Sequence, residues 1–62
     1  MLKDYKFNKW QYEIEKCEHY GYYLLIFKNG ILNYKWSGFG SKSMAKIYLQ
    51  EYIIEHEHNI EI

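Results

Sequence analysis

The stretch that decides the fold reads YYLLIFKNGILNYKW and runs from Tyr22 to Trp36. The pair Asn29-Gly30 lies near its middle, between two runs of aromatic and aliphatic residues. An Asn-Gly pair flanked in this way is the strongest short-range indication of a β-hairpin, because a type I′ turn needs positive φ at both central residues. We therefore predict a hairpin over residues 22–36 with its turn at 29–30.

The two-residue turn also predicts which side chains share a face. Lys28 would lie opposite Ile31, and opposed residues point to the same side of a sheet while successive residues alternate. One face then collects apolar and aromatic side chains, which we assign to the core: Tyr23, Leu25, Phe27, Leu32, Tyr34 and Trp36. The mixed face is predicted to meet solvent or a partner, and it carries Tyr22, Leu24, Ile26, Lys28, Ile31, Asn33 and Lys35.

A further strand is predicted over residues 9–17, where apolar and polar residues alternate. Trp10, Tyr12 and Ile14 would join the core face, and Gln11, Glu13 and Glu15 the other face. Gly21 marks the turn into the hairpin, so this strand should pair antiparallel with the next one. Residues 1–8 have no clear period, and we expect a lead-in arm whose Tyr5 and Phe7 pack back onto the domain.

A helix is predicted over residues 42–57, with Ser41 or Ser43 as its N-cap. Its apolar arc would consist of Met44, Ala45, Tyr48, Leu49 and Tyr52, with Ile53 at the border. The predicted fold class is therefore α+β. It is a single domain over residues 1–62, in which a three-stranded antiparallel meander carries one C-terminal helix on one face.

Composition restricts the class of protein. The 62 residues include one cysteine, Cys17, so no internal disulfide can form. No apolar run approaches the ~18 residues of a membrane span, and we expect a cytoplasmic protein, in the host cytoplasm if it is viral. The formal net charge is zero, but residues 47–62 contain four Glu and no Lys.

The order of these elements resembles the AP2 and integrase arm-type domains. The resemblance rests on the strand with Trp10, the turn at Asn29-Gly30, and the junction Gly38-Phe39-Gly40-Ser41-Lys42-Ser43-Met44-Ala45, and it covers residues 9–54. It implies that DNA binds the sheet face opposite the helix, with phosphate contacts from Lys9, Lys28, Lys35 and Lys42. The chain has no arginine, however, and Glu13 and Glu15 would oppose phosphates on that face.

No residue pattern indicates an enzyme, a cofactor or a metal site. The spacing of His19, His56 and His58 fits no metal-ligand motif. Cys17 lies near His19 but lacks the orienting group and oxyanion site of a nucleophilic pair. The segment 38–43 departs from a phosphate-binding loop because Ser41 stands before Lys42. We therefore predict a non-enzymatic protein.

The mixed hairpin face carries the functional prediction, because a contiguous apolar patch on a small domain marks an interaction site. Its predicted partner-binding residues are Tyr22, Leu24, Ile26, Ile31, Glu13, Glu15 and Lys35. Aromatic richness and neutral charge favour a protein partner, or a second copy in a homodimer. Size and composition favour a small inhibitor or adaptor of viral or mobile-element origin. The alternative is a DNA-binding domain that uses the same face.

Overall fold

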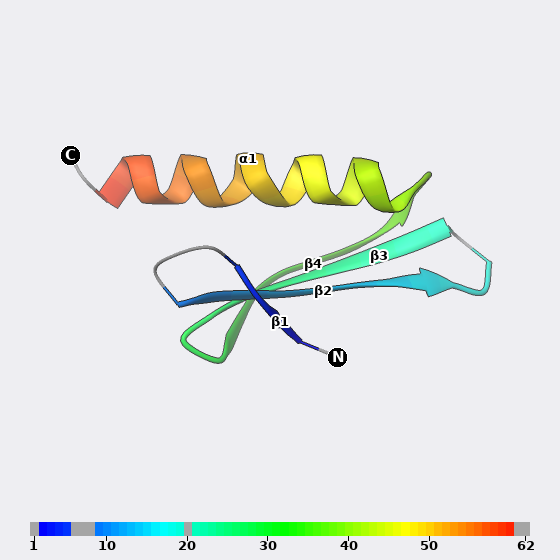
Figure 1. Cartoon of the computed structure of the whole chain (residues 1–62), viewed down its shortest axis with the longest axis horizontal. Helices are drawn as coiled ribbons and strands as arrows, with labels where there is room; N and C mark the ends of the chain where they lie inside the picture. The colour runs from blue at the N-terminus through cyan, green and yellow to red at the C-terminus, as the bar shows by residue number, and fades with distance from the viewer. Residues whose placement is uncertain (1, 6–8, 20, 61–62) are drawn as a thin grey trace.

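The computed structural model describes residues 2–5, 9–19 and 21–60, with helix side chains described as far as residue 57. These residues form an antiparallel sheet in chain order and one C-terminal helix that lies lengthwise over one face of it (Figure 1). The elements are β1 (Lys3–Asp4), β2 (Trp10–Cys17), β3 (Gly21–Lys28), β4 (Ile31–Phe39) and α1 (Lys42–Ile60). The α+β prediction is confirmed, but the described sheet has four strands and not three.

The additional strand, β1, belongs to the segment that we expected to be a lead-in arm. Lys3 pairs with Tyr12, and the Tyr5 amide donates a 2.8 Å hydrogen bond to the Trp10 carbonyl. The Tyr5 ring packs against the core, as predicted, and Phe7 lies outside the described residues. A strand of two residues is too short to show the alternation by which strands are recognised in a sequence.

The predicted turn is confirmed, because Asn29 has φ 54° and Gly30 has φ 78°. The first pairs beside it are also as predicted, and Phe27 lies opposite Leu32. The next pair is Ile26 with Tyr34, so one residue of β4, Asn33, is left over. This is a β-bulge, which places two residues of one strand against one of its neighbour.

Because of the bulge and the β2–β3 register, the face of β3 that we predicted to be outside is buried, and the face that we predicted to be the core lies outside. Leu24 and Ile26 have 0% exposure and lie in the core, so their assignment to the partner face was wrong. Cys17 closes the β2–β3 turn opposite Gly21, and this places Ile14 beside Leu24. The bulge brings Tyr34 of β4 beside Ile26 on the same side. The core face of β2 is confirmed, since Trp10 is buried while Tyr12 and Ile14 pack against the core.

Helix α1 begins as predicted but is rotated relative to the predicted arc. The Met44 amide donates a 3.2 Å hydrogen bond to the Ser41 hydroxyl, which confirms Ser41 as the N-cap. The fully buried helix residues are four apart: Ala45, Leu49 and Ile53. Met44 and Tyr48, which we placed within the arc, are exposed instead. The stripe continues four residues further to Glu57, which also contacts the sheet.

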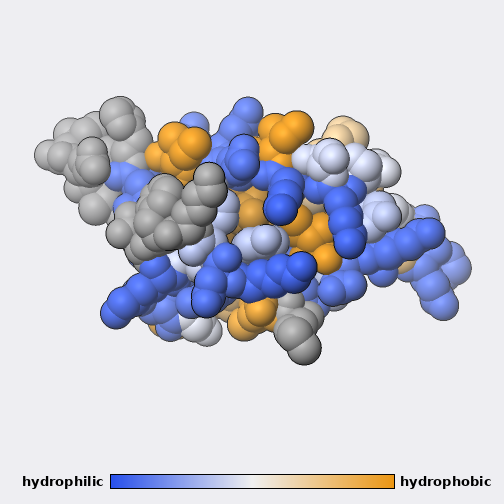
Figure 2. Space-filling view, in the orientation of Figure 1, coloured by the Kyte–Doolittle hydropathy of each residue, from blue (hydrophilic) through white to orange (hydrophobic). Residues whose placement is uncertain are grey.

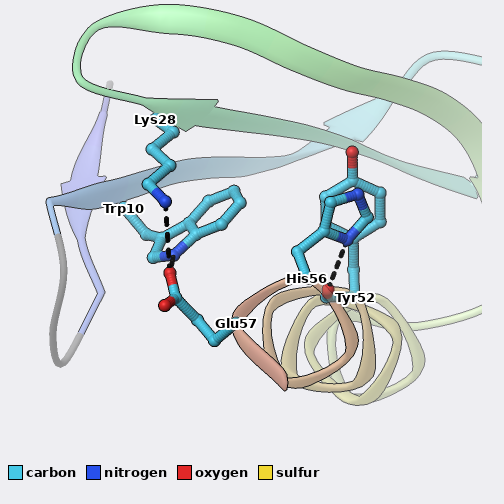
Figure 3. Close-up of polar contacts among 5 residues, drawn as sticks. All are labelled: Trp10, Lys28, Tyr52, His56 and Glu57. Carbon is cyan, nitrogen blue, oxygen red and sulfur yellow. Dashed lines mark hydrogen bonds and ion pairs between the residues drawn. The ribbon is translucent and has the colours of Figure 1, made fainter. Parts of the chain in front are cut away.

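Glu57 joins the last turns of α1 to the sheet (Figure 3). One carboxylate oxygen accepts a 2.6 Å hydrogen bond from the Trp10 indole nitrogen and lies 3.3 Å from Lys28 Nζ. The same Lys28 ammonium lies 5.0 Å from the centre of the Trp10 ring, within the range of a cation–π contact. We call Trp10, Lys28 and Glu57 the polar latch.

Among the described residues, α1 is not apolar enough over its length to cross a membrane.

Candidate functional site

The candidate site is the face of the sheet turned away from α1, which we call the outer face. Since side chains alternate along each strand, it takes every second residue of β2, β3 and β4. Figure 1 shows no described element over this face, and Figure 2 shows hydrophobic side chains at the surface on this lower side of the molecule. The strand registers place Asp4 of β1 on it beside Gln11, and Cys17 at its far end. Between them they assign these residues to it: Gln11, Glu13, Glu15, Tyr23, Leu25, Phe27, Leu32, Lys35 and Ser37.

The last nine of these residues form three rows across β2, β3 and β4. The central row is Glu13, Leu25 and Lys35, which are paired directly from strand to strand. The rows on either side are Glu15–Tyr23–Ser37 and Gln11–Phe27–Leu32. An apolar and aromatic column on β3 is therefore bordered by carboxylates on β2 and by a lysine on β4.

A hollow of about 630 Å³ opens on this side of the molecule. Its lining comes from all three long strands: Cys17, Tyr23, Leu25, Leu32, Lys35, Trp36 and Ser37. Trp36 is 59% exposed and Leu32 is 48% exposed, so our assignment of these two residues to the core was wrong. Both lie on β4, the last strand of the sheet order, whose outer edge no described strand pairs.

A hydrogen bond fixes the acidic side of the central row. The Tyr23 hydroxyl donates to a Glu13 carboxylate oxygen at 2.6 Å. This contact raises the pKa of Tyr23 to about 12 and lowers the pKa of Glu13 below its usual range. Glu13 is therefore a charged carboxylate at neutral pH, held in a defined orientation beside the apolar column.

The structure brings part of the predicted partner-binding set together. Glu13, Glu15 and Lys35 lie on the outer face, as predicted. Leu24 and Ile26 lie beneath α1, and Ile31 is 67% exposed beside the turn, opposite Lys28. Tyr22, which alternates with the outer-face residue Tyr23, shares the inner face with Leu24.

The lysines of the DNA-binding alternative do not gather on one surface. Lys35 belongs to the outer face, whereas Lys28 belongs to the polar latch beneath the helix. Lys42 begins α1 and lines a separate hollow of about 210 Å³ together with Lys3 and Lys46. Lys9 precedes β2, and its carbonyl accepts a hydrogen bond from the Asn29 amide.

Sequence reasoning missed the outer-face residues Tyr23, Leu25 and Phe27, because it assigned them to the core. A signal was available in the turn between β2 and β3. If Gly21 is paired with Cys17 across this turn, the register places Ile26 opposite Tyr12 and Leu24 opposite Ile14. Because Tyr12 and Ile14 face the core, this pairing assigns Leu24 and Ile26 to the core as well.

The histidines show no clustering that would form a metal site among the described side chains. The Nδ1 atom of His56 lies 2.9 Å from the Tyr52 carbonyl, and its ring stacks on the Tyr52 ring with the centres 4.1 Å apart (Figure 3). His19 lies 3.9 Å from the Glu18 carboxylate.

No protein-family model, curated protein or solved structure matches this chain.

Proposed function

We propose that this chain is a non-enzymatic protein-binding module and that its outer face is the contact surface. The observation that carries the proposal is the apolar column of Tyr23, Leu25 and Phe27 with the exposed Leu32 beside it. The exposed Trp36, at the edge of the sheet, lines the same hollow. No described element covers this column. Contiguous apolar surface on a small domain is typical of an interaction site, and aromatic residues are enriched at protein interfaces.

The charges of the outer face favour a protein over a nucleic acid. Two carboxylates, Glu13 and Glu15, lie on its β2 side, and Lys35 lies on its β4 side. A third carboxylate, Asp4 of β1, lies beside Gln11 on the same face. A phosphate backbone would be repelled by the first pair, and binding to it depends on the number of cationic contacts. A protein partner can present an apolar centre with charges of the opposite sign at each border.

Leu25→Asp tests the proposal, because Leu25 lies in the central row and outside the buried core cluster. The matched control is Ile54→Asp, the same class of change at a residue that is 59% exposed on α1. Wild type and both variants serve as baits in parallel pull-downs, after far-UV circular dichroism has shown that each is folded. We expect the Leu25 variant to lose a captured protein or a second copy of the chain, and the Ile54 variant to retain it.

Binding that is the same for all three baits would contradict the proposal. The DNA-binding alternative is measured separately, by titrating duplex DNA at two salt concentrations. Lysine–phosphate contacts would make the affinity fall steeply with salt. A steep fall that Lys35→Gln reduces would favour DNA binding at the outer face instead.

A further inference from the structure

We infer that the outer face binds a second copy of this chain, with the two sheets packed face to face about a twofold axis parallel to β3. This inference rests on the proposed function of the outer face and names its partner. It follows from the order of charges across the central row.

Consider a twofold axis that runs parallel to β3 in the plane between two copies. It places β3 of one copy over β3 of the other, β2 of the first over β4 of the second, and β4 of the first over β2 of the second. Each row then faces the same row of the other copy in reverse order. In the central row, Glu13 of each copy faces Lys35 of the other, and Leu25 faces Leu25. The twofold makes this ion pair twice, as expected of a self-complementary isologous interface.

The other twofold in that plane runs across the strands and is disfavoured by the same charges. It would lay β2 over β2 and β4 over β4, so that in the central row Glu13 would face Glu13 and Lys35 would face Lys35. Like charges placed together in an interface cost several kcal/mol. The arrangement of charges therefore selects the axis parallel to the strands.

The dimensions of packed sheets fit this pairing. Facing sheets lie ~10 Å apart with their strands within about 30° of parallel, which the long side chains of Glu13 and Lys35 can span. Within one chain, the same two residues are separated by β3, two strand spacings or roughly 9–10 Å. The hydrogen bond from Tyr23 holds the Glu13 carboxylate in place before association, which reduces the entropy lost on binding.

The area available predicts a weak, reversible dimer. Three strands ~4.8 Å apart and about eight residues long at ~3.3 Å per residue give a face of roughly 350–400 Å² on each copy. Standard stable interfaces bury about 800 Å² on each partner. Association should therefore be measured at chain concentrations from about 1 μM to 1 mM.

Charge exchange between Glu13 and Lys35 is the test, with sedimentation equilibrium of the full chain as the measurement. We expect wild type to approach twice the 7.7 kDa chain mass as its concentration rises. Glu13→Lys and Lys35→Glu should each weaken association by about tenfold or more, because each places like charges together twice. Mixing the two variants should restore association, and so should combining both changes in one chain. Glu13→Gln should weaken it less than Glu13→Lys.

Glu55→Lys is the matched control, because it changes the net charge as Glu13→Lys does but lies exposed on α1, away from the outer face. It should leave association nearly unchanged. Equal weakening by both lysine variants, or no recovery in the mixture, would overturn the inferred register. A wild-type chain that stays monomeric at 1 mM would overturn the inference altogether. In that case, capture of another protein that depends on Leu25 would still support the proposed function.

Discussion

Glycine is needed at position 21 and at position 30 for different reasons. Both have φ 78°, a conformation that costs a residue with a Cβ atom about 1–2 kcal/mol. At Gly30 a Cβ would meet open space, whereas at Gly21 it would collide with the Phe39 carbonyl oxygen. We expect Gly30→Ala to cost roughly the backbone term and Gly21→Ala to cost clearly more. Urea unfolding of the two variants measures the difference, and equal losses would mean that β4 can move away from Gly21.

Leu24 and Leu25 are neighbours in sequence with opposite environments. Leu24 is fully buried beneath α1, and Leu25 lies on the outer face. Truncation of a buried leucine removes apolar contacts and leaves a cavity, so Leu24→Ala should cost ~2–5 kcal/mol. Leu25→Ala should cost less than Leu24→Ala in denaturant unfolding at a concentration where the chain is monomeric. The reverse order would show that the faces of β3 are those that we first predicted.

At the scale of elements, the β3–β4 hairpin shows how far sequence reasoning reaches. The turn at Asn29-Gly30 and the pair Phe27–Leu32 were predictable, because turn chemistry acts over a few residues. The bulge at Asn33 was not, since nothing in the local residue types requires it. Its carbonyl accepts a hydrogen bond from the Tyr52 hydroxyl at 3.5 Å, a tertiary contact that depends on α1. A one-residue change in register exchanges the faces of a strand, so the missed bulge at Asn33, together with the β2–β3 register, displaced much of the predicted core.

The polar latch makes a prediction about the attachment of α1. Glu57→Ala removes the acceptor of the buried Trp10 N–H group and the partner of Lys28, which should cost about 1–3 kcal/mol. Glu57→Gln keeps an acceptor and should cost less. Glu55→Ala is the matched control, because Glu55 is an exposed carboxylate on the same turn of the helix. Equal unfolding midpoints for the Glu57 and Glu55 alanine variants would show that the latch contributes nothing to stability.

At the scale of the whole molecule, one helix can cover one face of a sheet, and this limits what a chain of 62 residues can bury. The sequence therefore predicted correctly that a face would remain outside, and it placed Glu13, Glu15 and Lys35 on it. Which apolar residues lie between these charges depended on the register, and those were predicted incorrectly. Charged positions on β2 were recoverable because their alternation is local, whereas the apolar column of β3 depends on how β3 pairs with β2.

The aromatic contacts between β4 and α1 make the stability of the whole fold sensitive to alkaline pH. The Tyr34 ring lies 5.3 Å from the Tyr48 ring and 5.1 Å from the Tyr52 ring, measured between centres. Burial, and then the hydrogen bond with Tyr48, raises the pKa of Tyr34 from 10.0 to about 12, and burial also raises the pKa of Tyr52. In this range the unfolded chain releases protons that the folded chain still holds, so the free energy of unfolding should fall as the pH rises from 10 to about 12.

Tyr34→Phe tests the origin of this fall, because it keeps the ring and removes the ionisable hydroxyl. We expect the free energy of unfolding of this variant, measured by urea titration at several pH values, to decline less steeply than wild type between pH 10 and about 12. Phe39→Leu is the control, since Phe39 packs on Tyr48 with ring centres 5.7 Å apart and does not titrate. Its curve should lie below that of wild type and run parallel to it. A Tyr34→Phe curve that also runs parallel would show that Tyr34 titrates alike in the folded and unfolded chain.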